Sequence, residues 1–231
     1  MRVVVAGGHG KIALRLTRQL VARSDAVVSL IRNPDQADEL RELGAHPVVL
    51  DLESATPEQV AEQVRYADAV VFAAGAGAGS GAERKQTMDR DGAILLADAA
   101  RLAGVQRYLL VSSMGAGAPP RPGTDEVFAA YQKAKGEAEE ELRHRPDLAL
   151  TILRPGRLTD DPGTGRIRLA PEAEPGEVTR DDVAWVLAAL LDEPDTAGLT
   201  LELVGGGASI AQAVSSVART GHGVRPEPNG P

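Results

Sequence analysis

Tyr131 and Lys135 are the residues of this sequence whose types and spacing most directly suggest chemistry. They stand four positions apart in a segment of helical period, 125–143, so both side chains project from one face of the expected helix. An ammonium group near a phenol favours the phenolate, which suits a proton donor or acceptor for a carbonyl or an alcohol. The pair therefore predicts acid–base chemistry at Tyr131, and a half-buried packing tyrosine with a solvated hydroxyl is the alternative.

Two serines could bring hydroxyl groups to the same site. Ser112 and Ser113 end the apolar run LLVSSMG, which precedes the helix of Tyr131. Hydroxyl groups at this position could polarise a substrate oxygen. The alternative for both serines is that they satisfy backbone groups at the end of a strand.

A glycine-rich turn follows the first apolar run of the chain. Gly7, Gly8 and Gly10 come directly after VVVA and open a segment of helical period. Without a Cβ the backbone can turn sharply and approach a pyrophosphate, whose charge then meets the positive end of the helix. This context predicts a dinucleotide site, with an ordinary strand-to-helix turn as the alternative. His9 and Lys11 are candidates to touch phosphate, or are solvated side chains of the turn.

The residues after the second and third apolar runs suggest which dinucleotide binds. Arg32 stands where proteins that prefer NAD commonly carry an acid, and its guanidinium could hold the 2′-phosphate of NADP, with Asn33 adding an amide donor. NADP is therefore favoured over NAD, and a solvated Arg32 is the alternative. Asp51 and Leu52 would flank the adenine, although Asp51 could equally cap the next turn.

The elements that must position these residues alternate along the chain. We expect strands at 2–6, 26–31, 46–50, 69–74, 107–112, 148–153 and 200–204, and helices at 11–23, 36–43, 57–66, 89–103, 125–143 and 180–191. Several strands are apolar on both faces, as in a parallel sheet covered by helices on each side. The predicted fold is a single α/β domain of the Rossmann-type, doubly wound class over 1–219, with a disordered tail at 220–231.

Three segments after strands are predicted to be substrate loops. The stretches 75–81 and 115–123 are rich in glycine and proline and follow the fourth and fifth strands. The stretch 155–177 follows the sixth strand and shows neither helical nor strand period. We expect it to be a flap over the substrate, or else a long surface connection.

Composition narrows the function classes. The 231 residues carry 25 basic and 33 acidic side chains, a net charge of −8 without a basic patch, so nucleic acid is disfavoured as a partner. The absence of cysteine excludes disulfides, thiolate metal ligands and a cysteine nucleophile, and fits a reducing cytosol. No apolar run is long enough to span a membrane. We expect a cytoplasmic protein that acts on a small molecule, without membrane or metal, and leave monomer or dimer open.

Taken together, these motifs resemble the atypical short-chain dehydrogenase/reductases, in the NAD(P)-binding group related to NmrA-like proteins and biliverdin reductase B. The resemblance extends nearly from end to end. It is carried by VVVAGGHGKIA, LIRNP, the DL of VVLDLE, VVFAAGAG, DGAILLADAARLAGVQRYLLVSSMGA, YQKAKGEAEEEL, LTILRPGRL and VTRDDVAWVLAALLDEPDTAGLTLELVGG.

This resemblance implies a role for each motif. The implied cofactor ligands are Gly7, Gly10 and Ile12 at the pyrophosphate, Arg32 and Asn33 at the 2′-phosphate, Asp51 and Leu52 at the adenine, Ala73, Ala74 and Gly75 along the adenosine, and Pro155 beside the nicotinamide. Ser112 or Ser113, Tyr131 and Lys135 correspond to the hydroxyl–tyrosine–lysine set of the reductases. Lys135 is also a candidate ligand of the nicotinamide ribose.

The expected function is that of an NADPH-dependent oxidoreductase. Its acceptor would be a small carbonyl, a quinone, a flavin-like molecule or another conjugated compound. One alternative is an NmrA-like redox sensor that binds NADP without turnover. A further alternative is an isomerase or epimerase with transient hydride transfer, which the short C-terminal region disfavours because little chain is left to enclose a sugar nucleotide.

Overall fold

The computed structural model describes residues 1–77, 79–120 and 123–221. Its strands are β1 (Arg2–Ala6), β2 (Ala26–Ile31), β3 (His46–Val49), β4 (Ala69–Phe72), β5 (Arg107–Val111), β6 (Ala149–Pro155), β7 (Arg157–Thr159), β8 (Arg166–Ala170), β9 (Glu177–Thr179), β10 (Thr200–Gly205) and β11 (Ala208–Ser209). Its helices are α1 (Lys11–Ala22), η1 (Pro34–Gln36), α2 (Ala37–Glu42), α3 (Pro57–Val64), α4 (Ala82–Arg84), η2 (Lys85–Asp91), α5 (Gly92–Ala103), α6 (Glu126–Arg143), α7 (Arg180–Leu191), η3 (Pro194–Thr196) and α8 (Ile210–Gly221).

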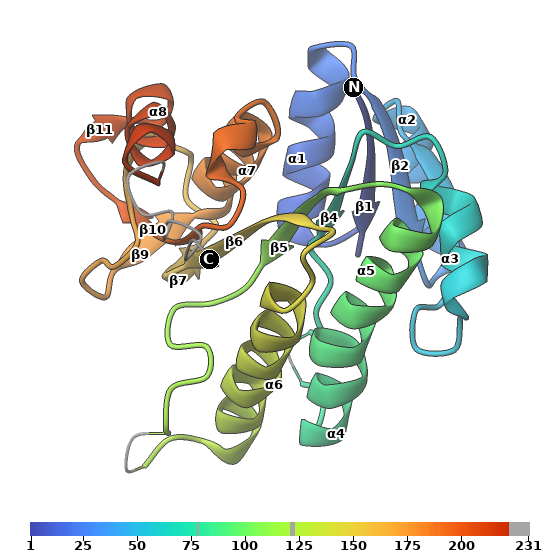
Figure 1. Cartoon of the computed structure of the whole chain (residues 1–231), viewed down its shortest axis with the longest axis horizontal. Coiled ribbons are helices and arrows are strands. Elements are labelled where there is room, and N and C mark those ends of the chain that lie inside the picture. The colour runs from blue at the N-terminus through green and yellow to red at the C-terminus, as the bar shows by residue number, and fades with distance from the viewer. Residues whose placement is uncertain (78, 121–122, 222–231) are drawn as a thin grey trace, which may run out of the picture.

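The central sheet fixes where a ligand can bind. Within the described residues its order is β11-β8-β10-β6-β5-β4-β1-β2-β3, and the strands from β10 to β3 are parallel (Figure 1). The chain runs outward from β1 to β3 and then crosses back to β4 on the other side of β1. Ligands of such sheets bind beyond the carboxyl ends of the strands at this reversal, which here lies between β1 and β4.

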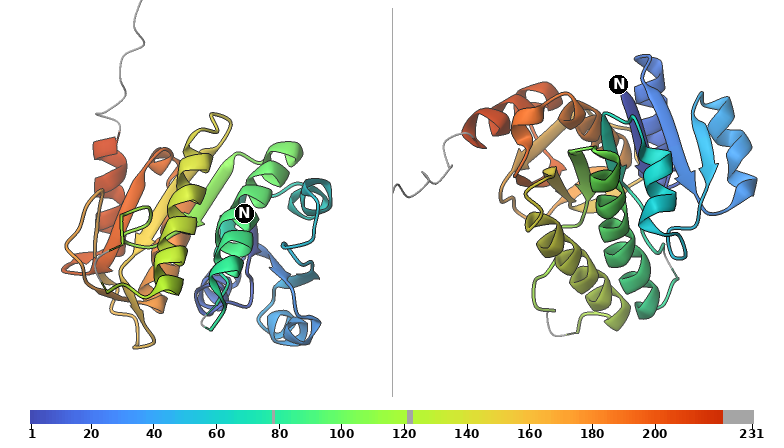
Figure 2. Two further views of the ribbon diagram at one scale, coloured as in Figure 1. Left: turned by 90° about the horizontal axis from the view of Figure 1, so that it is seen from below. Right: turned by 45° about the vertical axis from the view of Figure 1, so that its right-hand side comes forward.

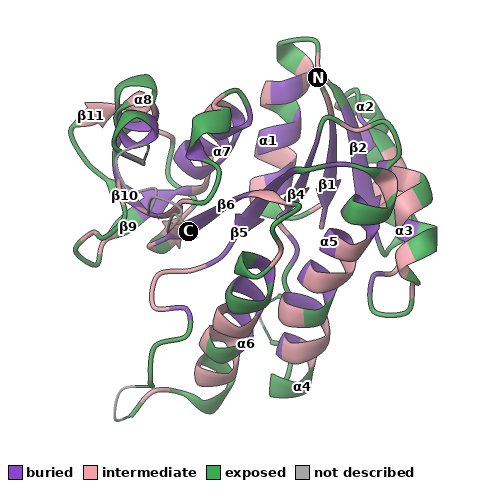
Figure 3. Ribbon diagram, in the orientation of Figure 1, coloured by how far each residue is buried: buried purple, intermediate pink, exposed green. Residues whose placement is uncertain are grey.

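Helices cover both faces of the sheet. Helices α1, α7 and α8 lie on one side, and α3, α5 and α6 lie on the other (Figures 1 and 2). Along β1, Val3 and Val5 belong to the core under α1, whereas Val4 and Ala6 belong to the core under α5. Because successive side chains of a strand point to opposite faces, this alternation places β1 between two apolar layers. Figure 3 shows the same burial along the central strands. The predicted fold class is confirmed.

The expectation that 155–177 lacks regular secondary structure is wrong. This segment contains β7, β8 and β9, and β8 pairs antiparallel with β10 and so extends the sheet. In β8 the buried Ile167 and Leu169 alternate with the exposed Arg166 and Arg168. That period of two extends over only five residues, too few to stand out in a stretch rich in glycine and proline.

The helices also differ from the sequence prediction at two places. The helical path before α5 starts at Ala82, seven residues ahead of the expected start at Asp89, and passes through the π-helical η2. Helix α8 was not predicted, although Ala213, Val214 and Val217 are buried at helical spacing. Thr220 and Gly221 end α8, and the rest of the predicted tail, 222–231, lies outside the described residues.

Two kinds of feature are absent from the described part of the chain. None of its helices combines the length and the apolar composition needed to cross a membrane. No group of three or more His, Asp or Glu side chains is arranged there to hold a metal ion.

Candidate functional site

At Gly7 and Gly8, the turn after β1 is packed so closely that a side chain would not fit. Gly7 has a φ of +76°, and a Cβ on it would lie 2.5 Å from the Cα of Ala74. A Cβ on Gly8 would lie 2.5 Å from the Cβ of Ser29. Gly10 is the N-cap of α1 and offers no side chain to the helix, whose first turn holds no acid. The first amides of α1 are therefore left to an anion, as a pyrophosphate cradle requires.

A first pocket lies beside this turn, with a volume of about 270 Å³. It is formed by the turn, the carboxyl ends of β2 and β3, and the segment after β4. Its lining residues are Gly7, His9, Gly10, Leu30, Ile31, Arg32, Asn33, Gln36, Leu50, Asp51, Leu52, Ala73, Ala74, Gly75, Arg84 and Met88. The structure thus brings together ten of the residues predicted to bind a cofactor.

The far end of the first pocket holds two guanidinium groups around one carboxylate. Arg32 Nη1 lies 3.3 Å from Glu53 Oε2, and Arg84 Nη2 donates to the same oxygen at 2.9 Å. Thr87 donates to the other carboxylate oxygen at 2.6 Å. Partial burial opposes ionisation of Glu53, but the hydrogen bonds from Arg84 and Thr87 hold its pKa below the ordinary value. One of the two positive charges therefore remains available to a ligand.

The polar residues predicted at the adenosine end are engaged in their own turns. Asn33 Oδ1 accepts from the amide of Asp35 at 3.1 Å and caps η1, which leaves its NH₂ group as the donor. Asp51 Oδ1 accepts from the amide of Glu53 at 3.0 Å. Asp51 thus caps the turn after β3, the alternative given by the sequence, and still lines the pocket.

A second pocket, of about 470 Å³, continues the first across the carboxyl edge of the sheet. The two share Ala73, Ala74 and Gly75, so they form one groove over the end of β4. The second pocket is lined by Ile12, Ala73, Ala74, Gly75, Ala76, Gly77, Gly79, Lys85, Asp89, Val111, Ser112, Asp125, Val127, Phe128, Tyr131, Lys135 and Leu158. Besides the three shared residues, the predicted residues that meet there are Tyr131, Lys135, Ser112 and Ile12.

Helix α6 presents Tyr131 and Lys135 to this pocket together. Lys135 is 3% exposed, and its Nζ lies 5.9 Å from the centroid of the Tyr131 ring. The same Nζ donates to the carbonyl of Val111 at 3.1 Å and forms an ion pair with Asp89 Oδ1 at 3.2 Å. Tyr131 is half-buried, and Phe128 stacks on it with 6.0 Å between ring centroids. The ammonium is therefore anchored beside a tyrosine that faces the cavity.

The two serines are placed differently from each other. Ser112 lines the second pocket, but its buried hydroxyl donates to Glu139 Oε1 at 2.5 Å. Glu139 is also bound by Arg154 and Arg143. Ser113 does not line either pocket, and its hydroxyl donates to the carbonyl of Met114 at 3.3 Å. In this arrangement neither serine directs its hydroxyl hydrogen at the cavity.

Three further predicted residues, Gly8, Lys11 and Pro155, do not line the groove, whereas His9 lines the first pocket. Lys11 pairs with Asp160 at 2.6 Å, and His9 Nε2 lies 2.7 Å from Glu39 Oε2. Gly8 is buried against β2 and Pro155 is buried at the end of β6, and neither lines a pocket.

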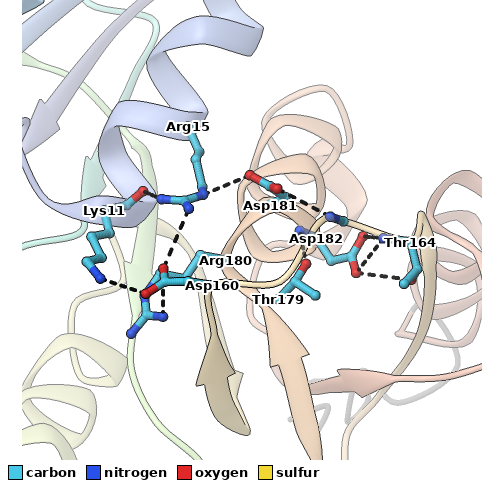
Figure 4. A network of polar contacts seen from close by, with 9 residues as sticks. Lys11, Arg15, Asp160, Thr164, Thr179, Arg180, Asp181 and Asp182 are labelled. Atoms are coloured by element: carbon cyan, nitrogen blue, oxygen red, sulfur yellow. Dashed lines mark hydrogen bonds and ion pairs between the residues drawn. The ribbon is translucent and has the colours of Figure 1, made fainter.

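The contact of Lys11 belongs to a network between α1 and α7 (Figure 4). Asp160, which follows β7, also pairs with Arg180 at 3.0 Å, and Arg15 pairs with Asp181 at 2.8 Å. The hydrogen bond from Lys11 is the main reason that the pKa of Asp160 is lowered. The segment after β7 is thereby tied to the start of the helix that carries the anion cradle.

Sequence reasoning missed three residues in the segment between β4 and α5. Arg84, Lys85 and Asp89 all line the groove, and Asp89 is fully buried with its Oδ2 accepting from the amide of Ala76 at 3.1 Å. Lys85 and Asp89 have the same spacing of four as Tyr131 and Lys135. That spacing was the available signal, but the expected helix began only at Asp89, so Lys85 was not placed on the same helix. Glu53, which binds Arg32 and Arg84, and Glu139, which accepts from Ser112, have no spacing in the sequence that indicates these contacts.

Comparison with known proteins gives consistent matches. The NAD(P)H-binding family matches residues 7–194. An uncharacterized sugar epimerase of Bacillus subtilis, YhfK, is 34% identical over 218 residues, which cover 94% of this chain and 100% of that protein. Among solved structures, a candidate NAD-dependent epimerase/dehydratase from Bacillus halodurans is 36% identical, with a TM-score of 0.85, and the match covers 94% of this chain and 99% of that one. The anaerobillin reductase ChuY from Escherichia coli O157:H7 is 28% identical, with a TM-score of 0.73 and coverage of 89% and 97%.

Proposed function

Because this chain belongs to the NAD(P)H-binding family, we propose that it is an NADPH-dependent oxidoreductase that reduces a small carbonyl, quinone, flavin-like or other conjugated acceptor. Membership of the family confirms the resemblance found in the sequence.

One observation carries the proposal: the two pockets form a single groove with different chemistry at its two ends. The first pocket contains the glycine turn and the two arginines, which suit a pyrophosphate and an adenosine. The second contains a tyrosine, an anchored lysine and a phenylalanine, which suit the nicotinamide and an acceptor beside it. When bound, NADPH supplies the hydride.

The preference for NADPH rests on Arg32 and Arg84. Both line the first pocket, and they share only one carboxylate, that of Glu53. A phosphate group on the 2′-oxygen would provide the second anion, and guanidinium groups bind phosphate by paired, charge-assisted hydrogen bonds. An unphosphorylated ribose would leave this positive charge without a partner.

Tyr131 is the proposed proton donor. Its ring forms part of the wall of the second pocket, and the ammonium of Lys135 beside it stabilises the phenolate that remains after the proton has moved to the acceptor oxygen. Asp89 and the carbonyl of Val111 hold that ammonium in place. The residues of the pocket thus bind the acceptor, direct the proton and fix the charge that supports the transfer.

The test is to follow loss of reduced nicotinamide with a panel of quinones, flavins and aldehydes. We expect NADPH to be consumed with at least one acceptor. Tyr131→Phe should lower kcat about 10²- to 10⁴-fold while the Kd for NADPH stays the same. Tyr66→Phe, at an exposed tyrosine away from both pockets, is the matched control. An unchanged kcat in Tyr131→Phe would remove that residue from the reaction.

An epimerase or isomerase is the second candidate, because YhfK, 34% identical, is described as a sugar epimerase. Such an enzyme would interconvert isomers without net consumption of NADPH. The same panel, with sugar nucleotides added and their products analysed, separates the two candidates. Tight NADPH binding without any product would instead indicate a redox sensor.

A further inference from the structure

A buried ammonium in the second pocket has no carboxylate partner. Lys85, the first residue of η2, is 7% exposed, and its Nζ donates to the carbonyl of Gly77 at 2.9 Å. Among the described residues, no carboxylate oxygen lies within 4.0 Å of this Nζ. Burial of an ammonium is costly unless it is paired as well as hydrogen-bonded, so this arrangement lacks an anion.

The other charges of the pocket do not provide that anion. Lys135, the second buried ammonium, is already paired with Asp89. Asp125 is exposed, and its Oδ1 accepts from the amide of Phe128 at 3.0 Å as the N-cap of α6. The charges of the buried side chains of the pocket, Lys85, Asp89 and Lys135, therefore sum to +1, and the unpaired charge is that of Lys85.

The surroundings of Lys85 indicate the shape of a ligand. Its Nζ lies 5.6 Å from the centroid of the Tyr131 ring, on which Phe128 stacks with 29° between the ring planes. Val127 and Leu158 add apolar surface to the same cavity. An anion at Lys85 would thus be attached to a flat, apolar body that lies against these rings.

We propose that the second pocket accepts planar, conjugated molecules that carry a carboxylate, and that Lys85 binds this carboxylate. Lys85 is then a specificity-determining residue, and Tyr131 and Lys135 act at the reducible end of the same molecule. The identification of this ligand as the hydride acceptor rests on the proposed function. The binding of a carboxylate at Lys85 does not.

The test compares two probes of the same shape, the anionic 2-naphthoate and the neutral 2-naphthamide, by isothermal titration of the full chain saturated with NADP⁺. We expect the wild-type protein to bind the acid about tenfold to a hundredfold more tightly than the amide, as for a hydrogen bond to a charged group. In Lys85→Met this ratio should fall to about twofold or less, with the Kd for the amide unchanged. Lys85→Arg should retain most of the ratio.

Lys133→Met is the matched control, because it removes the same charge from the 71% exposed Lys133 on α6. Its acid-to-amide ratio should equal that of the wild type. Equal binding of the two probes by the wild type, binding of neither, or an unchanged ratio in Lys85→Met would overturn the inference. So would a loss of NADP⁺ affinity in Lys85→Met with the ratio preserved, because Lys85 would then belong to the cofactor site. If Lys85→Met does not fold, the acid-to-amide binding ratios of the wild type and of Lys85→Arg still test the inference.

Separate results test the proposed function. Consumption of NADPH with no discrimination between the probes would overturn this inference and leave the oxidoreductase intact. Discrimination between the probes without consumption of NADPH on any acceptor would do the reverse.

Discussion

The ion pair between Asp89 and Lys135 should have a large effect on stability when it is broken. Asp89→Asn removes the charge, yet its amide oxygen can still accept from the amide of Ala76, so the variant mainly leaves the Lys135 ammonium buried and uncompensated. The two side chains are 0% and 3% exposed, and breaking a pair buried to this degree costs about 3–5 kcal/mol. For a chain of this length the melting temperature should fall by about 6–20 °C.

The assay for this pair is urea denaturation of the single variants and of the double variant. We expect Lys135→Met to be destabilised as well, and the double variant to be more stable than the sum of the two losses predicts, with a coupling of about 1–3 kcal/mol. Glu137→Gln is a control on the same helix. It breaks two exposed pairs, with Lys133 at 3.8 Å and with Arg90 at 3.6 Å, and should cost less than about 1 kcal/mol. A cost below about 1 kcal/mol for Asp89→Asn, with additive single variants, would refute the reasoning.

Three further predictions concern cofactor binding and the N-terminal edge of the fold. Arg84→Ala should weaken NADPH binding about tenfold or more and leave NADH binding almost unchanged, as measured by fluorescence titration, because only the 2′-phosphate needs the second guanidinium. Gly7→Ala should lower both the NADPH affinity and the melting temperature more than Gly104→Ala does. Both glycines have positive φ, but only Gly7 lacks room for a Cβ, since nothing lies within 4 Å of that position on Gly104. Asp25→Asn should reduce the free energy of unfolding at pH 7 by about 1–3 kcal/mol, and urea denaturation should show this difference shrinking as the pH falls below about 4.

The pH dependence at Asp25 follows from the direction of its pKa shift. Burial opposes ionisation, but hydrogen bonds from the N-terminal amino group and from Arg23 lower the pKa of Asp25 below its ordinary value. The unfolded chain therefore binds more protons between the two pKa values. The stabilisation is fully present above the unfolded pKa and is lost as the pH falls through the folded one. A difference in the free energy of unfolding between wild type and Asp25→Asn that stays constant down to pH 2 would contradict this explanation. For the cofactor prediction, the contradicting result is an equal loss of NADPH and NADH affinity in Arg84→Ala.

The fold and the first pocket could be predicted from the sequence because their signals are local. Val3, Val4 and Val5 form a run that is apolar on both faces, which is typical of a covered parallel strand. Residues that end neighbouring parallel strands, such as Arg32 and Ala73, meet at one edge of the sheet whatever lies between them in sequence. The strand order alone therefore predicts that the residues of the first pocket lie together, and no side-chain contact has to be known for this.

The contacts of Ser112, the unpaired charge of Lys85 and strand β8 could not be predicted, because each depends on residues distant in sequence. The hydroxyl of Ser112 is directed by Glu139, whose burial no local pattern indicates. The charge on Lys85 becomes informative only when the structure shows that the one buried acid of the pocket, Asp89, is already paired with Lys135. Strand β8 is recognisable only through its pairing with β10, because five residues do not define a period.

The central claim is that one groove holds NADPH from the glycine turn to Tyr131, and a crystal structure with NADP⁺ tests it most directly. We expect the pyrophosphate on the amides that follow Gly7, with the 2′-phosphate within about 3.5 Å of Arg32 and Arg84. We also expect the nicotinamide in the second pocket, beside Tyr131 and Lys135. A cofactor bound outside this groove, or with its nicotinamide turned away from Tyr131, would contradict the account.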